Sequence, residues 1–264
     1  MELLLSALAG LPEFSALASL LTAGETAALS GVGQLPRSHF LAGLTRAVSR
    51  PALILCPDDQ SAQKCQIELA AFLGAAPALL PSREFTFCEA AVVSRGWEQR
   101  RLHLLWKLGK GQIPILVSSL EALSLRTMPP AVLFSAALTL RPGASFDLED
   151  LSRRLTAAGY ARTSLVEGVG QFSIRGGILD VSAYDSPLRA EFWGDEIDLL
   201  TFFDPLSQRR TAELSEAVLL PVAESLPHLH PEGTAGLIGQ IQTLLNKQRR
   251  RKTPHQLLIS TLES

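Results

Sequence analysis

The sequence predicts an α/β protein in which a parallel-sheet domain carries a smaller α+β domain built on an antiparallel sheet. Three observations predict this. From residue 1 to about residue 126, short apolar runs alternate with helical stretches, as an open α/β sheet requires. The run Met128-Pro129-Pro130 then interrupts the pattern. Beyond it, short alternating strands separated by glycine-containing turns indicate an antiparallel sheet.

The clearest unit of the first domain is a strand followed by a helix. Ala52–Cys56 is an apolar run suited to a strand buried on both faces. Asp58 then provides a helix cap, and Gly74 ends the helix. The apolar face of this helix consists of Cys65, Leu69 and Phe72. Farther along we expect a helix over about 98–108, a buried strand at 115–117 and a helical turn at 120–125.

The second domain begins with a helix and continues as strands. Asp147 caps the helix, leucines at 148, 151 and 155 share one face, and Gly159 ends it. The expected strands are Gln171–Arg175, Ile178–Ser182, 188–193 and 197–203. We therefore expect a first domain over 1–127, an inserted domain over 128–216, and a return of the chain to the first domain over 217–264.

Composition limits the possible functions. The chain has 264 residues, and its 24 Lys and Arg against 26 Asp and Glu leave a formal net charge of -2, so no overall field attracts it to nucleic acid or to an anionic membrane. No apolar run reaches ~18 residues, which predicts a chain without a membrane span. The cysteines show neither metal-ligand nor disulfide spacing, which favours the cytoplasm. They are Cys56, Cys65 and Cys88.

We find no pattern that indicates a catalytic nucleophile, a general base or a metal centre, so we expect a chain that is not an enzyme and holds no cofactor or metal. The histidines are scattered: His39, His103, His228, His230 and His255.

One segment has the spacing of a phosphate-binding loop, G-x-x-x-x-G-K-[ST], but not its residues. It begins at Gly31 and ends at Ser38, with Pro36 at the second glycine position and Arg37 at the lysine position. Such a loop binds phosphate through backbone N–H groups, and proline has none. We therefore predict a degenerate loop that does not bind nucleotide.

Two further patterns are weaker. Residues 195–198, Asp-Glu-Ile-Asp, match a DExD box, but the preceding strand alternates polar and apolar residues instead of being buried, so we expect the acids to cap a turn. The basic cluster at 247–252 is typical of a solvated helix end. A DNA-binding module that uses Arg249–Arg251 remains an alternative, which the near-neutral charge does not favour.

Strand alternation turns three large side chains of the second domain outward. Arg189 and Trp193 share a face of their strand, and Arg175 turns outward from another, so the three form a single patch if the two strands are neighbours. Arginine and tryptophan are enriched among interface hot spots, so these three residues are candidates for binding a protein. A solvated sheet face, with an Arg–Glu cross-strand pair and a half-covered tryptophan, is the competing interpretation.

The second domain also resembles a known family. The longest matching segments are Gly170-Gln-Phe-Ser-Ile-Arg-Gly-Gly-Ile-Leu-Asp-Val181 and Pro187-Leu-Arg-Ala-Glu-Phe-Trp-Gly-Asp-Glu-Ile-Asp198. They are similar to the UvrA-binding domain shared by the excision-repair protein UvrB and the transcription-repair coupling factors. The region before it resembles the flanking helicase-like domain of the P-loop type in degenerate form.

Two departures favour the coupling factors over UvrB. UvrB has a working phosphate loop and a tyrosine-rich hairpin, whereas this chain has Pro36 and Arg37 in the loop and no tyrosine over 81–90. Members of the coupling-factor family are far longer, so we expect an N-terminal fragment. A UvrB-type, ATP-dependent excision-repair helicase subunit is the alternative.

The resemblance implies a non-catalytic module that binds UvrA and recruits it to a stalled RNA polymerase. The family's UvrA contacts carry over to Arg175, Arg189 and Trp193, where the last position usually holds phenylalanine. RNA polymerase and DNA would be bound only through regions that this chain lacks.

Overall fold

The computed structural model describes residues 2–82, 95–184, 187–227, 230 and 232–250. The chain divides into two compact units, Met1–Thr127 and Met128–Ser264. Each unit has its own apolar clusters.

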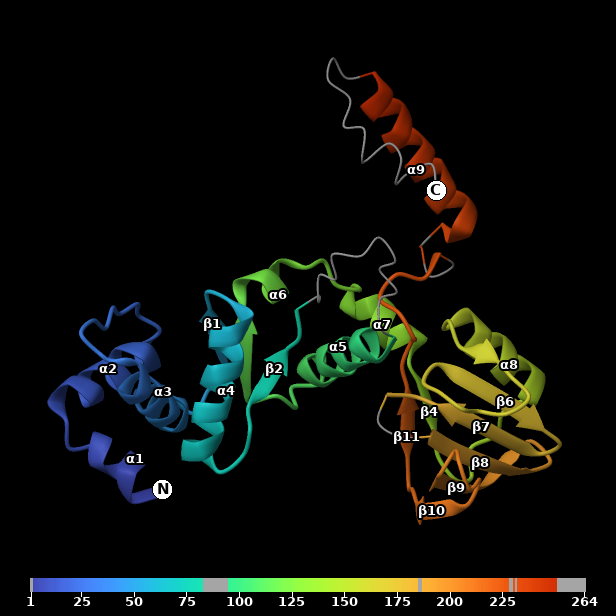
Figure 1. Cartoon of the computed structure of the whole chain (residues 1–264), viewed down its shortest axis with the longest axis horizontal. Coiled ribbons are helices and arrows are strands. Elements are labelled where there is room, and N and C mark those ends of the chain that lie inside the picture. Colours follow the sequence, from blue (N-terminus) through green and yellow to red (C-terminus); the bar gives the residue numbers. More distant parts are fainter. Residues whose placement is uncertain (1, 83–94, 185–186, 228–229, 231, 251–264) are drawn as a thin grey trace. The chain divides into compact units, whose positions relative to one another are not determined.

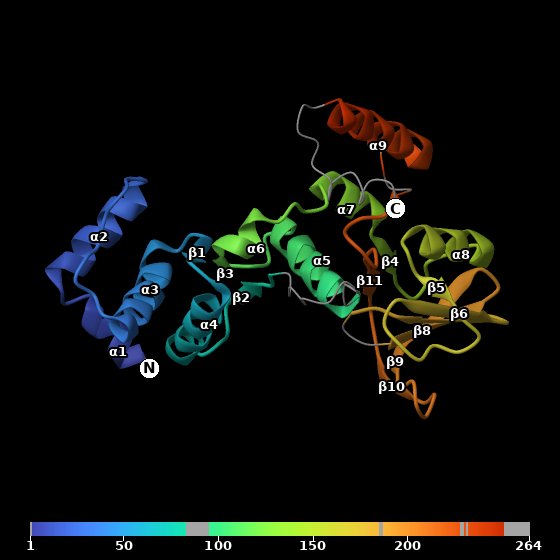
Figure 2. The ribbon, with the colours of Figure 1, turned by 45° about the horizontal axis from the view of Figure 1, so that its top comes forward.

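The first unit is built on a three-stranded parallel sheet in the order β1-β3-β2 (Figures 1 and 2). Its strands are β1 (Ala52–Cys56), β2 (Ala78–Leu80) and β3 (Ile115–Ser119). Its helices are α1 (Glu2–Leu8), α2 (Pro12–Ala23), α3 (Gln34–Val48), α4 (Asp59–Leu73), α5 (Arg95–Gly109) and α6 (Leu120–Ser124). The predicted parallel α/β architecture of this unit is confirmed.

The ends of α4 follow the predicted chemistry. The Asp58 carboxylate accepts a hydrogen bond from the Ser61 amide at 2.7 Å, which satisfies a donor that has no partner within the helix. Gly74 ends the helix with a φ of 77°, a left-handed conformation that glycine adopts without a steric penalty. Both predicted signals are confirmed.

The prediction that β1 is buried on both faces is wrong. Ile54 and Cys56 pack in a cluster with α1, α2, α3 and α4, but Leu53 and Leu55 are exposed. The second apolar cluster of this unit contains Leu80 of β2 and Leu116 of β3, but neither Leu53 nor Leu55 of β1. An apolar run therefore did not distinguish a strand that is covered on one face from a strand that is covered on both.

The second unit is built on a six-stranded sheet in the order β10-β9-β8-β7-β6-β5 (Figure 2). All neighbours are antiparallel except β5 and β6, so the sheet is mixed. Its strands are β5 (Ala161–Arg162), β6 (Gln171–Arg175), β7 (Ile178–Ser182), β8 (Pro187–Trp193), β9 (Glu196–Phe203) and β10 (Arg210–Glu213). The four strands predicted from alternation are present, while the short strands β5 and β10 were not predicted.

One helix covers one face of this sheet. In α8 (Leu148–Ala157), Leu151 and Leu155 are buried and pack with Phe172 of β6. The Asp147 carboxylate accepts from the Asp150 amide at 2.7 Å, so the predicted cap is confirmed. The opposite face of the sheet is consequently the one on which polar side chains gather.

This unit also contains a short two-stranded sheet, formed by β4 and β11. The helix α7 (Pro130–Ala136) begins at Pro130, where the sequence pattern breaks, and β4 (Leu138–Leu140) follows it. The strand β11 (Ala217–Leu219) pairs with β4, and the Tyr160 hydroxyl donates to the carbonyl of Leu220 at 2.8 Å. Residues 217–220 thus pack within the second unit. The return of 217–264 to the first domain stays a prediction.

The last described helix is α9 (Gly233–Arg249), which has no buried residue. Within the described part of the chain, no helix is both long and apolar enough to cross a membrane.

Candidate protein-interaction site

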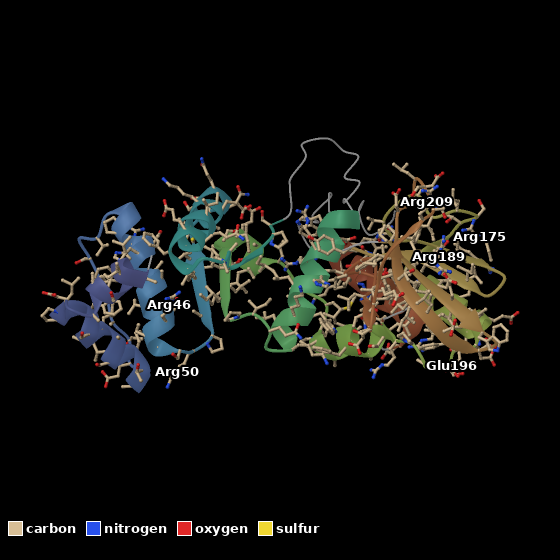
Figure 3. The ribbon with its side chains drawn as sticks, turned by 90° about the horizontal axis from the view of Figure 1, so that it is seen from below. Arg46, Arg50, Arg175, Arg189, Glu196 and Arg209 are labelled. Carbon is tan, nitrogen blue, oxygen red and sulfur yellow. The ribbon has the colours of Figure 1, made fainter. Side chains whose placement is uncertain are left out.

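The candidate site lies on the polar face of the six-stranded sheet. In the register of the strands, Ser173 of β6 is opposite Asp180 of β7, which is opposite Arg189 of β8. Because residues directly opposite each other share a face, these side chains lie in one row across the sheet. Figure 3 shows Arg175 and Arg189 close together in the second unit.

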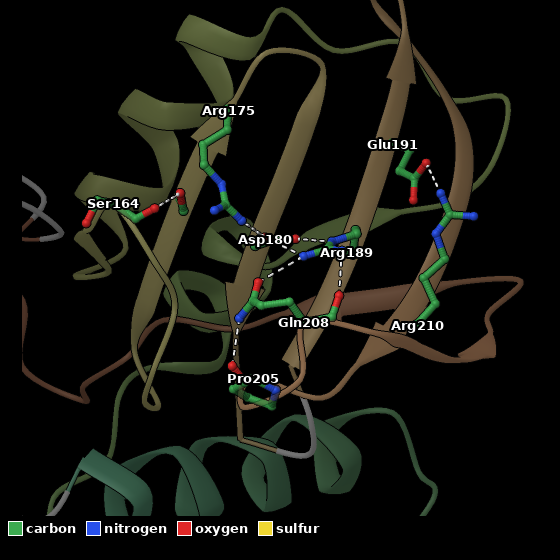
Figure 4. A network of polar contacts seen from close by, with 9 residues as sticks. Ser164, Arg175, Asp180, Arg189, Glu191, Pro205, Gln208 and Arg210 are labelled. Atoms are coloured by element: carbon green, nitrogen blue, oxygen red, sulfur yellow. Dashed lines mark hydrogen bonds and ion pairs between the residues drawn. The ribbon is translucent and has the colours of Figure 1, made fainter.

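One carboxylate of this row joins two arginines. Asp180 accepts hydrogen bonds from Arg189 Nε at 2.6 Å and Nη2 at 2.9 Å, and from Arg175 Nη2 at 2.8 Å (Figure 4). The Asp180 side chain is 1% exposed. Two guanidinium charges against one carboxylate leave the group with one net positive charge.

Arg189 is also bound to the chain that connects β9 and β10. Its Nη1 donates to the Gln208 carbonyl at 3.1 Å and its Nη2 to Gln208 Oε1 at 3.2 Å. Its guanidinium carbon lies 4.8 Å from the ring centroid of Phe203. Hydrogen bonding to Asp180 raises the pKa of Arg189 above its ordinary value. We call Arg175, Asp180, Arg189 and Gln208 the arginine cluster.

The three predicted contact residues differ in how much they reach solvent. Trp193 is 85% exposed and the Arg175 side chain 48%, but the Arg189 side chain is only 12% exposed. Arg189 lies on the predicted face, yet Asp180, Gln208 and Phe203 surround it. The expectation that Arg189 points freely into solvent is corrected, because the connection between β9 and β10 folds over it.

The competing interpretation of this face is partly borne out. Glu191 of β8 does form a cross-strand ion pair, but with Arg210 of β10 and not with Arg189. Trp193, however, is not half covered. Glu191 and Arg210 neutralise each other, whereas the arginine cluster keeps one net positive charge.

A close backbone contact fixes the position of Trp193 next to the β6–β7 turn. The Phe192 amide donates to the Gly177 carbonyl at 2.7 Å. A Cβ atom at Gly177 would lie 2.9 Å from the Phe192 carbonyl oxygen, closer than real Cβ atoms approach. Position 177 therefore requires glycine to bring the two strands together.

The degenerate phosphate loop of the first unit leads into α3, and its motif residues differ from one another in exposure. Gly31 precedes α3 with a φ of 77°, whereas Pro36 and Arg37 are exposed within the first turn of that helix. Ser38 is buried, and its hydroxyl donates to the Glu68 carboxylate at 2.5 Å. The one residue that matches the phosphate-loop pattern after Gly31 thus turns toward an acid.

The DExD-like segment lies at the turn between β8 and β9. Gly194, with a φ of 63°, and Asp195 connect the two strands, and β9 begins at the next residue. Because an antiparallel hairpin does not deliver an acid as the buried parallel strand of a DExD box does, setting the box aside is confirmed.

The other candidate residues bear on a metal site and on a thiol with a shifted pKa, in so far as the structure describes them. The described residues include no cluster of three or more His, Cys, Asp or Glu side chains that could hold a metal ion. Burial raises the pKa of the Cys65 thiol to about 12, so it is protonated at neutral pH. Cys88, His228, His255 and most of 81–90 lie outside the described residues, as do Arg251 and Lys252 of the basic cluster.

Comparison with known proteins identifies the kind of domain that carries this face. The family model described as "UvrB interaction domain" matches residues 138–224, which include the whole arginine cluster and Trp193. The second unit therefore contains a UvrB interaction domain.

Similar proteins then define the family of the chain. It is 36% identical over 223 residues to the transcription-repair-coupling factor of Myxococcus xanthus, and 30% identical over 219 residues to that of Bacillus subtilis strain 168. These alignments cover 81% of this chain and 19% and 18% of the relatives, so the chain spans about a fifth of their length. UvrABC system protein B of Vibrio vulnificus is 29% identical over 196 residues, which cover 68% of this chain and 29% of that protein. The chain belongs to the transcription-repair coupling factors and represents their N-terminal UvrB-like region.

Residue-level reasoning missed two members of the site, Asp180 and Gln208. Asp180 was within reach, since alternation from Ile178 places it on the polar face beside two arginines. Gln208 gave no signal, because it follows a strand and its φ of 59° is set by the folded chain.

Proposed function

We propose that this chain is a non-catalytic docking module that binds UvrA through the polar face of its second unit. The observation that carries the proposal is the exposed indole of Trp193 on the same face as the half-exposed guanidinium of Arg175. An exposed tryptophan adds little to the stability of its own domain, and indole and guanidinium groups are the commonest anchors of protein interfaces. The match to a UvrB interaction domain over these residues supports a partner in excision repair.

The chemistry of this face sets what the partner must offer. Arg175 can pair with a carboxylate or a backbone carbonyl of UvrA, and the indole requires an apolar pocket that excludes water. Recruitment of UvrA to a stalled RNA polymerase, with polymerase and DNA bound by other regions of the full-length protein, belongs to the same proposal.

Binding of purified UvrA tests this directly. We expect Trp193→Ala to weaken UvrA binding by about 2 kcal/mol, or about 30-fold, as measured by isothermal titration calorimetry. Leu244→Ala on α9 is the matched control, because it also shortens an exposed apolar side chain of the second unit. Wild-type protein without affinity for UvrA, or a Trp193→Ala variant that binds as the wild type does, would contradict the proposal.

The competing function is nucleotide-dependent, as the similarity to UvrABC system protein B suggests. The construction of the loop argues for the non-catalytic role, because Pro36 removes a phosphate-binding N–H and the Ser38 hydroxyl donates to Glu68. We expect no binding of a Mg²⁺–ATP analogue at micromolar concentration. Micromolar affinity in an equilibrium binding assay would favour the enzyme.

A further inference from the structure

We propose that Asp180 is the positioning residue of the docking surface, holding Arg175 for the partner and, through Arg189 and Gln208, the turn formed by residues 204–209. This inference rests on the proposed function, since it names how the same face is organised to bind the same partner. Asp180 itself is buried and does not reach the partner.

The bonding of the two arginines shows that they have different tasks. Arg189 has five N–H donors, and four of them are used by Asp180 and Gln208. Arg175 uses one donor on Asp180 and keeps the rest of its half-exposed guanidinium available. Arg189 therefore acts as an internal connection, and Arg175 as the group that meets the partner.

The energetics make Asp180 the centre of this arrangement. A buried carboxylate is costly unless it is paired and hydrogen-bonded, and Asp180 receives three charge-assisted hydrogen bonds. Removing its charge leaves two guanidinium groups side by side with no carboxylate between them. Their repulsion would move Arg175 and release Arg189 from its bidentate geometry.

The turn 204–209 is held at both ends. The Asp204 carboxylate accepts from the amides of Leu206 at 3.2 Å and Ser207 at 3.1 Å. At the other end, Gln208 receives two hydrogen bonds from Arg189 and donates its Nε2 to the Pro205 carbonyl at 2.7 Å. The turn is thus anchored to the sheet through Arg189.

This anchored turn presents an apolar side chain to water. Leu206 is 97% exposed, and its side chain gains nothing from the fold of this domain. Holding such a group in one place before binding reduces the entropy lost when a partner covers it. We therefore place Leu206 on the docking surface, at the opposite end of β8 from Trp193, with the arginine cluster between them.

The substitution Asp180→Asn distinguishes a positioning role of Asp180 from an attraction of UvrA by charge alone. The substitution keeps the shape of the side chain and raises the positive charge of the face by one. If the face attracts UvrA by its charge alone, Asp180→Asn tightens binding; if Asp180 positions the arginine cluster, binding weakens by about tenfold. Asp150→Asn on α8 is the control with the same change in charge, and we expect its affinity for UvrA to match the wild type.

Two measurements separate positioning from general damage to the fold. Hydrogen exchange, which needs no partner, should show the amides of 206–210 exchanging about tenfold faster in Asp180→Asn, with the α8 amides unchanged. A mutant cycle compares the effect of Asp180→Asn in the wild type with its effect in the variant that carries both Arg175→Ala and Leu206→Ala. In that variant Asp180→Asn should cost little further affinity, because Asp180 acts through those two residues. A cost that adds in full would overturn the proposal.

The remaining outcomes decide between a failure of this inference and a failure of the proposed function. If Asp180→Asn does not fold, Gln208→Ala and Leu206→Ala must each weaken UvrA binding, and wild-type affinity in either one overturns the inference. If Trp193→Ala and Arg175→Ala lose binding while Asp180→Asn and Leu206→Ala do not, only this inference fails. If wild-type protein does not bind UvrA, the proposed function fails, and the exchange rates then report on the anchoring of the turn alone.

Discussion

The degenerate loop of the first unit and the arginine cluster of the second both carry polar side chains in motif-like segments, but they use them in opposite ways. In the loop, Ser38 turns inward to Glu68 while Pro36 and Arg37 stand exposed on the first turn of α3. In the cluster, a buried carboxylate supports an arginine that stays half exposed. Of these two arrangements, the second holds a charged group on a buried partner and still leaves it open to solvent, which is the property that the proposed docking surface requires.

The largest effect should come from removing the support of the second sheet. Phe172 is fully buried beneath α8, and Phe172→Ala leaves a cavity that costs about 3–5 kcal/mol of unfolding free energy. Urea denaturation followed by circular dichroism measures this, with loss of UvrA binding in parallel. A cost below about 1 kcal/mol would mean that the site does not depend on this packing.

A matched pair of arginines sharpens the comparison. Arg175→Ala should weaken UvrA binding by about tenfold and reduce its dependence on salt, because an interfacial charge is lost. Arg37→Ala removes an equally exposed charge from the loop and should leave the affinity unchanged. Calorimetric titrations at two ionic strengths would record both, and equal losses would refute the contrast between the two regions.

Aspartate caps in the two units should respond alike to acid. Hydrogen bonds from Ser61 lower the pKa of Asp58, and hydrogen bonds from Ser207 and Leu206 lower that of Asp204. A depressed folded-state pKa means that the stabilisation is present above the unfolded value of about 3.9 and is lost as the pH falls through the folded value. NMR titration of the two carboxyl groups should therefore give midpoints below about 3.9, and a midpoint at or above it would contradict the capping geometry.

The smallest effect is expected from repairing the loop. The double substitution Pro36→Gly and Arg37→Lys restores the motif, but Ser38 still donates to Glu68. We expect no gain in binding of a Mg²⁺–ATP analogue in an equilibrium assay. A variant that binds the analogue at micromolar concentration would show that the loop lost its ligand through these two residues alone.

Local signals in the sequence predicted much of this fold. The caps at Asp58 and Asp147 and the strands Gln171–Arg175 and Ile178–Ser182 depend on neighbouring residues, and the structure has them where they were expected. The exposure of Leu53 and Leu55 was not predictable in this way. It depends on which face of β1 other elements cover, and hydrophobic periodicity does not contain that information.

The site shows the same limit. Alternation turned Arg175, Arg189 and Trp193 outward from their strands, because the direction of a side chain follows from strand geometry, but it did not predict that β7 lies between the two strands. It did not predict the burial of Arg189, which results from a contact with Gln208, 19 residues away in the chain. Long-range contacts of this kind separate a residue that faces outward from one that is accessible.

The meeting of Gly177 with Phe192 has a consequence for how this surface can vary. A main-chain contact sets the distance between the β6–β7 turn and the end of β8. Other apolar side chains can therefore fill the interior without shifting Arg175 and Trp193. Natural and designed variants should therefore accept volume-conserving changes beneath the sheet more readily than any replacement at position 177.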